Sequence, residues 1–210
     1  MPDAAFWNKI ADGYAAKPVD DPDAFERKIA ITRSLMPEPC SVLEIGCGTG
    51  SLALRLADRA ACYDGVDVSD VMLGHARSKA DAAGADHLNF HCMPFQRDTV
   101  PFAPETFDVV CAFSILHLVD DRTDTLAHLY ELVKPGGFLV ASTVCLANSW
   151  FPYGPVLAVM KAVGKAPAVT RLTSDQLAED VHEAGFRDIV HPDVGASRTI
   201  SFLHAVKPAA

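Results

Sequence analysis

The feature that most constrains this chain is residues 42–50, Val-Leu-Glu-Ile-Gly-Cys-Gly-Thr-Gly, where a short apolar run ends and three glycines alternate with small residues. Residues 51–56 then show the apolar spacing of a helix. This pattern predicts a strand, a tight turn and a helix start. Glycine allows a positive φ and lets a ligand approach main-chain atoms. The turn is therefore a candidate cofactor site, and a glycine-rich connection without a ligand is the plainer alternative.

The glycine spacing argues against a nicotinamide site. A dinucleotide fingerprint would place its third glycine at position 51, which is Ser51, whereas the spacing here is Glu-x-Gly-x-Gly-x-Gly. A nicotinamide oxidoreductase is accordingly a disfavoured alternative.

Further motifs follow in a fixed order. They are Gly-Val-Asp-Val-Ser at 65–69 with Met72, Pro-Phe-Ala-Pro-Glu-Thr-Phe-Asp-Val-Val at 101–110, Ser-Ile-Leu-His at 114–117, and Leu-Val-Lys-Pro-Gly-Gly at 132–137. Together with 42–50, this series resembles the class I S-adenosylmethionine-dependent methyltransferases of the small-molecule, type 11-like kind. The resemblance covers residues from about 40 to 145, and several spaced motifs are more specific than one.

The resemblance implies an α/β Rossmann-like three-layer sandwich. Its seven-stranded, mostly parallel sheet would have the order 3-2-1-4-5-7-6, with helices on both faces and the last strand antiparallel. We expect one domain over residues 1–210, with an N-terminal helical cap at 1–38 and an insertion at 147–172 that shapes the substrate pocket.

Periodicity and end signals predict the individual elements. Asp23 is expected to cap the second helix, and Thr173 to open a later helix with a capping box. The expected helices are 6–16, 23–36, 121–133 and 173–184, and the expected strands are 61–67, 87–92, 107–113, 138–145, 186–191 and 199–206.

The resemblance implies S-adenosylmethionine as cofactor and S-adenosylhomocysteine as product. Asp67 ends the second strand about twenty residues after the glycine turn, where a carboxylate can accept both hydroxyls of a ribose. Helix capping is the alternative for Asp67, although Ser69 and Asp70 are better placed for it. The candidate cofactor-binding residues are Tyr14, Glu44, Gly46, Cys47, Gly48, Gly50, Asp67, Val68, Met72, Met93, Phe113 and Ser114. Core packing is the alternative for Tyr14 and Met72, and a structural carboxylate for Glu44.

The adenine contact departs from the family pattern. Many relatives carry an acid soon after the third strand, whereas this chain has Met93-Pro94-Phe95-Gln96. Backbone groups near Met93 and the Gln96 side chain are the two alternatives.

Methyl transfer is an in-line displacement that depends mainly on positioning, and an acceptor that carries a proton needs a base. His117 is the best-placed candidate by motif position. A structural histidine bonded to backbone at a helix start is the alternative, and His91, Cys145 and Tyr153 are weaker candidates.

The remaining composition bounds the partners. The net charge of −9 argues against nonspecific binding of nucleic acid and favours a small-molecule substrate. The apolar and aromatic stretch 147–170, with Trp150, Phe151 and Tyr153, suggests a hydrophobic or aromatic acceptor. A surface for a second copy of the chain or for a membrane is the alternative for this stretch. A non-catalytic S-adenosylmethionine-binding subunit is the alternative function.

Six cysteines without any CxxC pair suggest neither a zinc site nor a disulfide framework. Residues 1–10 contain Asp3 and no long apolar core, so we expect no secretory signal. No apolar run is long enough to span a bilayer either, and we expect a cytoplasmic location.

Overall fold

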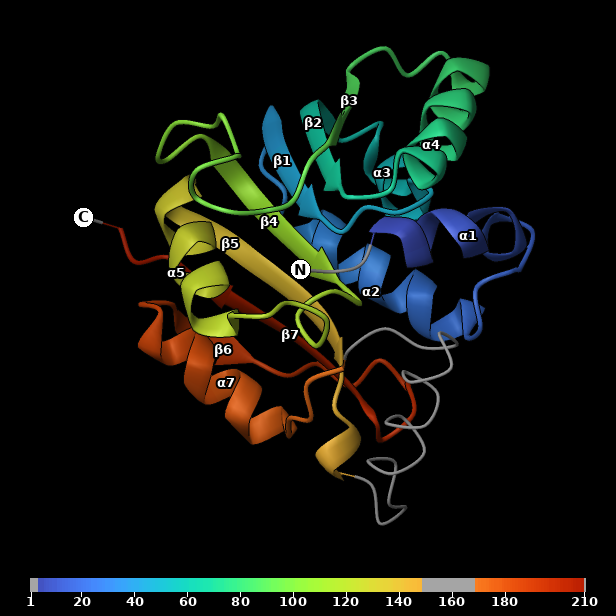
Figure 1. Cartoon of the computed structure of the whole chain (residues 1–210). Helices are drawn as coiled ribbons and strands as arrows, with labels where there is room; N and C mark the ends of the chain where they lie inside the picture. Colours follow the sequence, from blue (N-terminus) through green and yellow to red (C-terminus); the bar gives the residue numbers. More distant parts are fainter. Residues whose placement is uncertain (1–3, 149–168, 210) are drawn as a thin grey trace.

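A seven-stranded sheet runs through the part of the chain that the computed structural model describes, residues 4–148 and 169–209 (Figure 1). The strands are β1 Cys40–Ile45, β2 Ala60–Asp67, β3 Leu88–Cys92, β4 Phe107–Phe113, β5 Val133–Val144, β6 Arg187–Val190 and β7 Ile200–Val206. Their order is β3-β2-β1-β4-β5-β7-β6, and β7 is antiparallel to β5 and β6 while the other pairs are parallel. The predicted fold class and strand order are confirmed.

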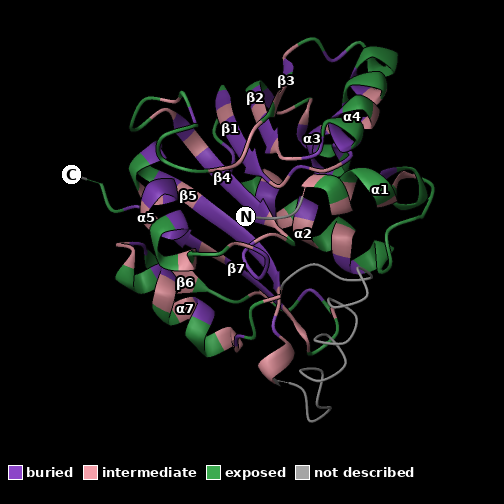
Figure 2. Ribbon diagram, viewed as in Figure 1, coloured by how far each residue is buried: buried purple, intermediate pink, exposed green. Residues whose placement is uncertain are grey.

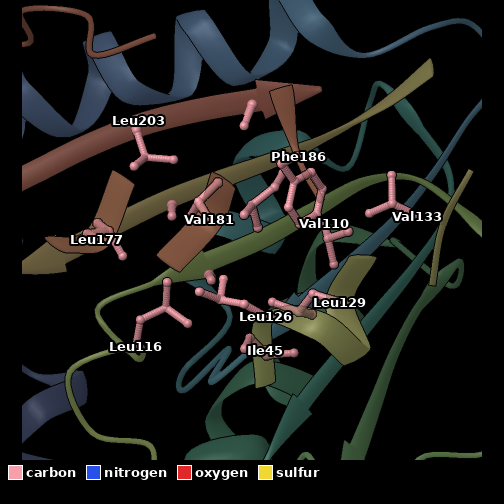
Figure 3. Packing of buried hydrophobic residues seen from close by; sticks show 14 of the residues in the cluster. Ile45, Val110, Leu116, Leu126, Leu129, Val133, Leu177, Val181, Phe186 and Leu203 are labelled. Carbon is pink, nitrogen blue, oxygen red and sulfur yellow. The ribbon is translucent and has the colours of Figure 1, made fainter. Parts of the chain in front are cut away.

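Helices cover both faces of the sheet. They are α1 Ala4–Ala15, α2 Pro22–Leu35, α3 Ser51–Leu56, α4 Asp70–Ala83, α5 Arg122–Leu132 and α7 Ser174–Glu183, with a 3-10 turn at Leu146–Asn148. One buried cluster joins the sheet to α5 and α7, and Figure 3 shows Leu126 and Leu129 of α5 in the same cluster as Val181 and Phe186. A second cluster joins the opposite face to α2 and α3.

The sheet supplies both clusters because successive residues of a strand point to opposite faces. Leu43 and Ile45 belong to the cluster under α5, and Val42 belongs to the cluster under α2. The central strands are accordingly buried, whereas the helices expose their outer sides (Figure 2). Strands that are covered on both faces read as continuous apolar runs, which is why β4 falls at the predicted bounds.

Two helix starts follow the predicted chemistry. The Ser69 hydroxyl accepts a hydrogen bond of 3.1 Å from the amide of Met72 and caps α4, which leaves Asp67 free of that task. Thr173 and Gln176 form the reciprocal bonds of the capping box at α7. Both predictions are confirmed.

The predicted cap of α2 was wrong by two residues. The Asp21 carboxylate accepts the amide of Ala24 at 3.0 Å, and Pro22 is the first helical residue. Proline suits that position because its fixed φ is helical and its missing N–H is not needed there. Asp23 lies in the first turn, where its charge complements the helix dipole.

The predicted start of the fifth strand was also wrong. β5 begins at Val133, directly after α5 ends at Leu132, because buried Val133 pairs with Phe107 of β4. The run Lys-Pro-Gly-Gly at 134–137 therefore lies within the strand. Gly136 has a φ of +79° and donates its amide to the carbonyl of Lys207 at 2.8 Å, which keeps this run paired.

The predicted aromatic insertion falls largely outside the described residues, as do Trp150, Phe151 and Tyr153. Among the residues that are described, none of the helices has both the length and the apolar character needed to cross a membrane.

Candidate active site

A cavity of about 450 Å³ opens at the carboxyl ends of β1, β2 and β4. This is the edge of a doubly wound sheet at which ligands bind. Ten of the predicted site residues line it: Tyr14, Gly46, Gly48, Asp67, Val68, Met72, Met93, Phe113, Ser114 and His117. The glycine turn, the β2 end and the β4 end are thus brought to one cavity.

The glycine turn is tied to the end of β2 by its own amides. The carbonyl of Val66 accepts hydrogen bonds from Gly46 at 2.7 Å and from Cys47 at 3.2 Å. Gly46, Gly48 and Gly50 have φ values of +68°, +52° and +72°. A side chain is strained in this left-handed region, so the turn requires glycine.

The three glycines differ in what surrounds them. A Cβ on Gly46 would lie 2.8 Å from the Ile115 side chain, and one on Gly50 would lie 2.9 Å from the Cβ of Ala76. A Cβ on Gly48 would have no atom of the described residues within 4 Å. Glycine is therefore needed for packing at 46 and 50. At Gly48 the space beside the backbone is open to the cavity, so a ligand can approach the main chain there.

Asp67 presents a carboxylate to the same cavity. Its Oδ2 accepts the amide of Gly48 at 2.9 Å, and its Oδ1 accepts the amide of Ser69 at 2.8 Å. Burial raises the pKa of this carboxyl, and the hydrogen bonds from Ser69 and Gly48 oppose that rise. An anchored carboxylate has further lone pairs available, so it fits the diol of a ribose.

Glu44 is the last residue but one of β1, the strand directly before the glycine turn. It does not line the cavity, and its Oε2 accepts the hydroxyl of Tyr63 at 2.6 Å. Both side chains are buried. Cys47 and Gly50 also do not line the cavity, since the thiol of Cys47 lies against Gly65 and Gly50 is the N-cap of α3.

The end of β4 carries Phe113, Ser114 and His117 into the cavity. Ser114 has a φ of +56°, and its amide donates to the carbonyl of Ser142 on β5 at 2.6 Å. A left-handed serine at the end of a strand is strained, and strain of this kind concentrates at functional sites.

His117 lies in the turn after β4 and is 7% exposed. Its buried Nδ1 has no hydrogen-bond partner among the described residues, so the alternative of a histidine bonded to backbone through this atom is not supported there. Burial lowers the pKa of His117 to about 4, which keeps the ring neutral near pH 7. Of the weaker candidates, His91 pairs with Asp64 away from the cavity, Cys145 does not line it, and Tyr153 is outside the described residues.

The segment after β3 forms another wall. The amide of Met93 donates to the carbonyl of Asp67 at 2.9 Å and is therefore already used. Phe95 stacks on His128 of α5 at 4.9 Å, and Arg97 binds Asp124 and Glu131 of the same helix. The Gln96 side chain lines the cavity without a hydrogen bond to any described residue.

Several lining residues were missed by sequence reasoning. Trp7 comes from α1, and the group at the start of α5 is mostly acidic. The missed residues include Trp7, Phe95, Leu118, Val119, Asp120, Asp121, Asp124, Thr125, Val144 and Val169. The sequence predicts Asp121 only as the start of a helix. Its carboxylate does cap α5, since it accepts the amide of Asp124. Within the described residues, no group of histidine, cysteine and acidic side chains could hold a metal ion.

Comparison with known proteins adds an independent observation. A family described as a methyltransferase domain matches residues 42–137. A ubiquinone biosynthesis O-methyltransferase from Saccharophagus degradans is 30% identical over 143 residues, covering 67% of this chain and 58% of that protein. An uncharacterized protein of Haemophilus influenzae is 30% identical over 152 residues, covering 70% of this chain and 59% of that protein. The chain thus spans less than two thirds of the length of these curated relatives.

Solved structures agree on the fold. A protein from Thermotoga maritima, described as a SAM-dependent methyltransferase and possible histamine N-methyltransferase, has a TM-score of 0.70 at 19% identity. The match covers 98% of this chain and all of that one. At this identity the likeness concerns the fold alone.

Proposed function

We propose that this chain, which belongs to the class I S-adenosylmethionine-dependent methyltransferases, transfers a methyl group to a small acceptor with an apolar or aromatic body. The observation that carries the proposal is the anchored Asp67 carboxylate beside the open backbone of Gly48, on one wall of a cavity at the carboxyl edge of the sheet. The family implies S-adenosylmethionine as cofactor and S-adenosylhomocysteine as product.

The walls of the cavity suit the parts of this cofactor. Asp67 would bind the ribose hydroxyls, and the glycine turn would face the methionine portion. Met72, buried on α4, would pack against the adenine. The Gln96 side chain, which bonds no described residue, would serve the adenine edge, because the amide of Met93 is already donated. Tyr14 and Trp7 of α1 would close the entrance.

The charge and polarity of the lining indicate the kind of acceptor. Phe95, Leu118, Val119, Val144 and Val169 give an apolar wall. The described lining contains four aspartates and neither lysine nor arginine. An anionic acceptor would meet no counter-charge there, so we propose an uncharged or cationic acceptor. The name of the Saccharophagus relative supports a small-molecule acceptor of this apolar kind.

When bound, S-adenosylmethionine would supply an electrophilic methyl group on a sulfonium sulfur, with the neutral thioether as the leaving group. The cavity residues contribute chiefly by orienting the two molecules and excluding water. We propose that His117 takes the proton of a hydroxyl acceptor. A ring whose pKa is about 4 is neutral at pH 7 and can accept a proton. A hydroxyl oxygen that has been methylated but still carries its proton is a much stronger acid than the protonated ring, so His117 needs no raised pKa for this step.

The proposal is tested by incubating the protein with S-adenosylmethionine and a panel of phenols, quinols, amines and carboxylates. Release of S-adenosylhomocysteine is measured by mass spectrometry. We expect turnover with neutral or amine acceptors and none with carboxylates. Tight binding of S-adenosylhomocysteine without turnover on any acceptor would instead support a non-catalytic binding subunit. Absence of binding would refute the proposal.

A further inference from the structure

Beneath the glycine turn lies a buried carboxyl that is held by a single hydroxyl group. Glu44 is 3% exposed and Tyr63 is fully buried, and the tyrosine hydroxyl donates to Oε2 of Glu44 at 2.6 Å. The two residues come from neighbouring strands, β1 and β2, and Glu44 is two positions before Gly46. The other carboxyl oxygen has no hydrogen-bond partner among the described residues.

This carboxyl also lacks a positive neighbour in the described structure. The ionisable groups that interact with Glu44 are Tyr63 of β2, Asp67 at the end of β2, Cys47 of the turn, Cys111 of β4 and Tyr14 of α1. None of these carries a positive charge. A buried carboxylate normally requires a cation or several donors. Burial therefore keeps this carboxyl mostly protonated in the free protein, and a cation bound nearby would favour its ionised form.

We propose that Tyr63 is a positioning residue for cofactor binding: its hydroxyl holds the Glu44 carboxylate under the glycine turn as the negative charge that complements the sulfonium of S-adenosylmethionine. The inference rests on the proposed function, because that function places a sulfonium at this turn. It extends that function by assigning a role to a tyrosine that lines no part of the cavity.

The proposal requires that binding of S-adenosylmethionine is coupled to the loss of a proton from Glu44. Burial raises the pKa of Glu44 to about 8, the hydrogen bond from Tyr63 opposes the rise, and the charge of Asp67 adds to it. The free carboxyl is therefore largely protonated at pH 7, and a cation that binds beside it favours loss of that proton. Affinity for the sulfonium should rise with pH up to about 8 and then level.

The experiment is titration calorimetry of the full chain with S-adenosylmethionine and, separately, with S-adenosylhomocysteine between pH 6 and 9. The second ligand has a neutral sulfur and serves as the charge control. Each titration is repeated in two buffers of different ionisation enthalpy, which counts the protons released. The variants are Tyr63→Phe and Glu44→Gln, and Tyr130→Phe is the matched control, since no described residue bonds its hydroxyl.

We expect Tyr63→Phe to weaken S-adenosylmethionine binding about tenfold at pH 7 and to move the rise in affinity about one pH unit upward. S-adenosylhomocysteine binding should change much less. Glu44→Gln, which can still accept the tyrosine hydroxyl, should remove the rise and the proton release. Tyr130→Phe should match the wild type.

The outcomes separate the two proposals. If the wild type binds neither ligand, the proposed function fails. If it binds both and Tyr63→Phe keeps the wild-type pH profile, the role of Tyr63 is refuted while the function stands. Thermal unfolding checks each variant. Should Tyr63→Phe not fold, Glu44→Gln decides, because a rise in affinity that persists in it overturns the inference.

Discussion

The backbone amide of Gly48 donates a 2.9 Å hydrogen bond to the Asp67 carboxylate, and this bond joins the glycine turn after β1 to the end of β2. With the amide of Ser69 on its other oxygen, the carboxylate is fixed before any ligand arrives. A site fixed in this way avoids the cost of ordering the side chain upon binding.

Replacing Asp67 with Ala should therefore abolish cofactor binding and leave the fold intact. Two charge-assisted hydrogen bonds to a ribose contribute about 3 kcal/mol or more, which corresponds to a loss of at least about a hundredfold in affinity. Calorimetry with S-adenosylhomocysteine measures this, and circular dichroism checks the fold. Asp70→Asn, on an exposed residue three positions later, is the control. Wild-type affinity in Asp67→Ala would refute the ribose assignment.

Two glycines of the same turn should respond differently to alanine. The methyl group of Gly48→Ala meets no described atom within 4 Å, so the substitution should cost only about 1–2 kcal/mol of backbone strain. The same methyl group occupies space at the cavity wall and should weaken cofactor binding at least about tenfold. Gly46→Ala would add a contact of 2.8 Å with Ile115 and should destabilise the protein by about 3 kcal/mol or more. Urea unfolding and calorimetry on both variants give the comparison. Equal losses of stability would contradict the assigned roles.

His117 should make stability depend on pH on the acid side. The unfolded chain binds a proton near the ordinary value of 6.5, whereas the folded state resists it down to about 4. Between these values the unfolded state binds more protons, so stability falls as the pH falls, by up to about 3 kcal/mol.

The variant His117→Gln should lack this loss. The difference in unfolding free energy between wild type and variant is measured by denaturant titration at several pH values from 7 to 4. His191→Gln, at an exposed position, is the control. Parallel curves for wild type and His117→Gln would show that His117 does not titrate as a buried group.

Arg97 should matter more for the cofactor than for stability. It ties the segment after β3 to α5 by a 3.0 Å bond from Nε to Asp124 and by a pair with Glu131. Exposed ion pairs contribute at most about 1 kcal/mol, so Arg97→Gln should unfold almost as the wild type does. Amide hydrogen exchange at 93–99 should become faster, and binding of S-adenosylhomocysteine several-fold weaker. Arg55→Gln, which breaks the exposed pair with Glu26 elsewhere, should leave both unchanged.

Much of the fold could be predicted because its signals are local. The β4 bounds and the capping box at Thr173 depend on short patterns whose physical cause lies within a few residues. Asp67 could be placed because the end of β2 lies beside the turn after β1 in any parallel sheet of this kind. The start of β5 could not be predicted from the sequence, since Val133 belongs to the strand only through its pairing with Phe107.

The site was harder to predict wherever the role of a residue depends on contacts with distant parts of the chain. The sequence alone does not reveal that Glu44 bonds Tyr63, because that partner lies on the next strand. It also does not reveal that Trp7 of α1 and Asp124 of α5 face one cavity, since their helices meet there only through the fold. The sequence patterns of these two helices do not indicate that they line a ligand site.

The left-handed backbone at Ser114 has a practical consequence for engineering. Any library meant to change the accepted compounds should leave this position as serine, or allow only glycine, asparagine or aspartate, because branched and bulky residues resist its φ of +56°. Diversity is better introduced at Val119, Val144 and Val169, which border the same hollow and show no positive φ.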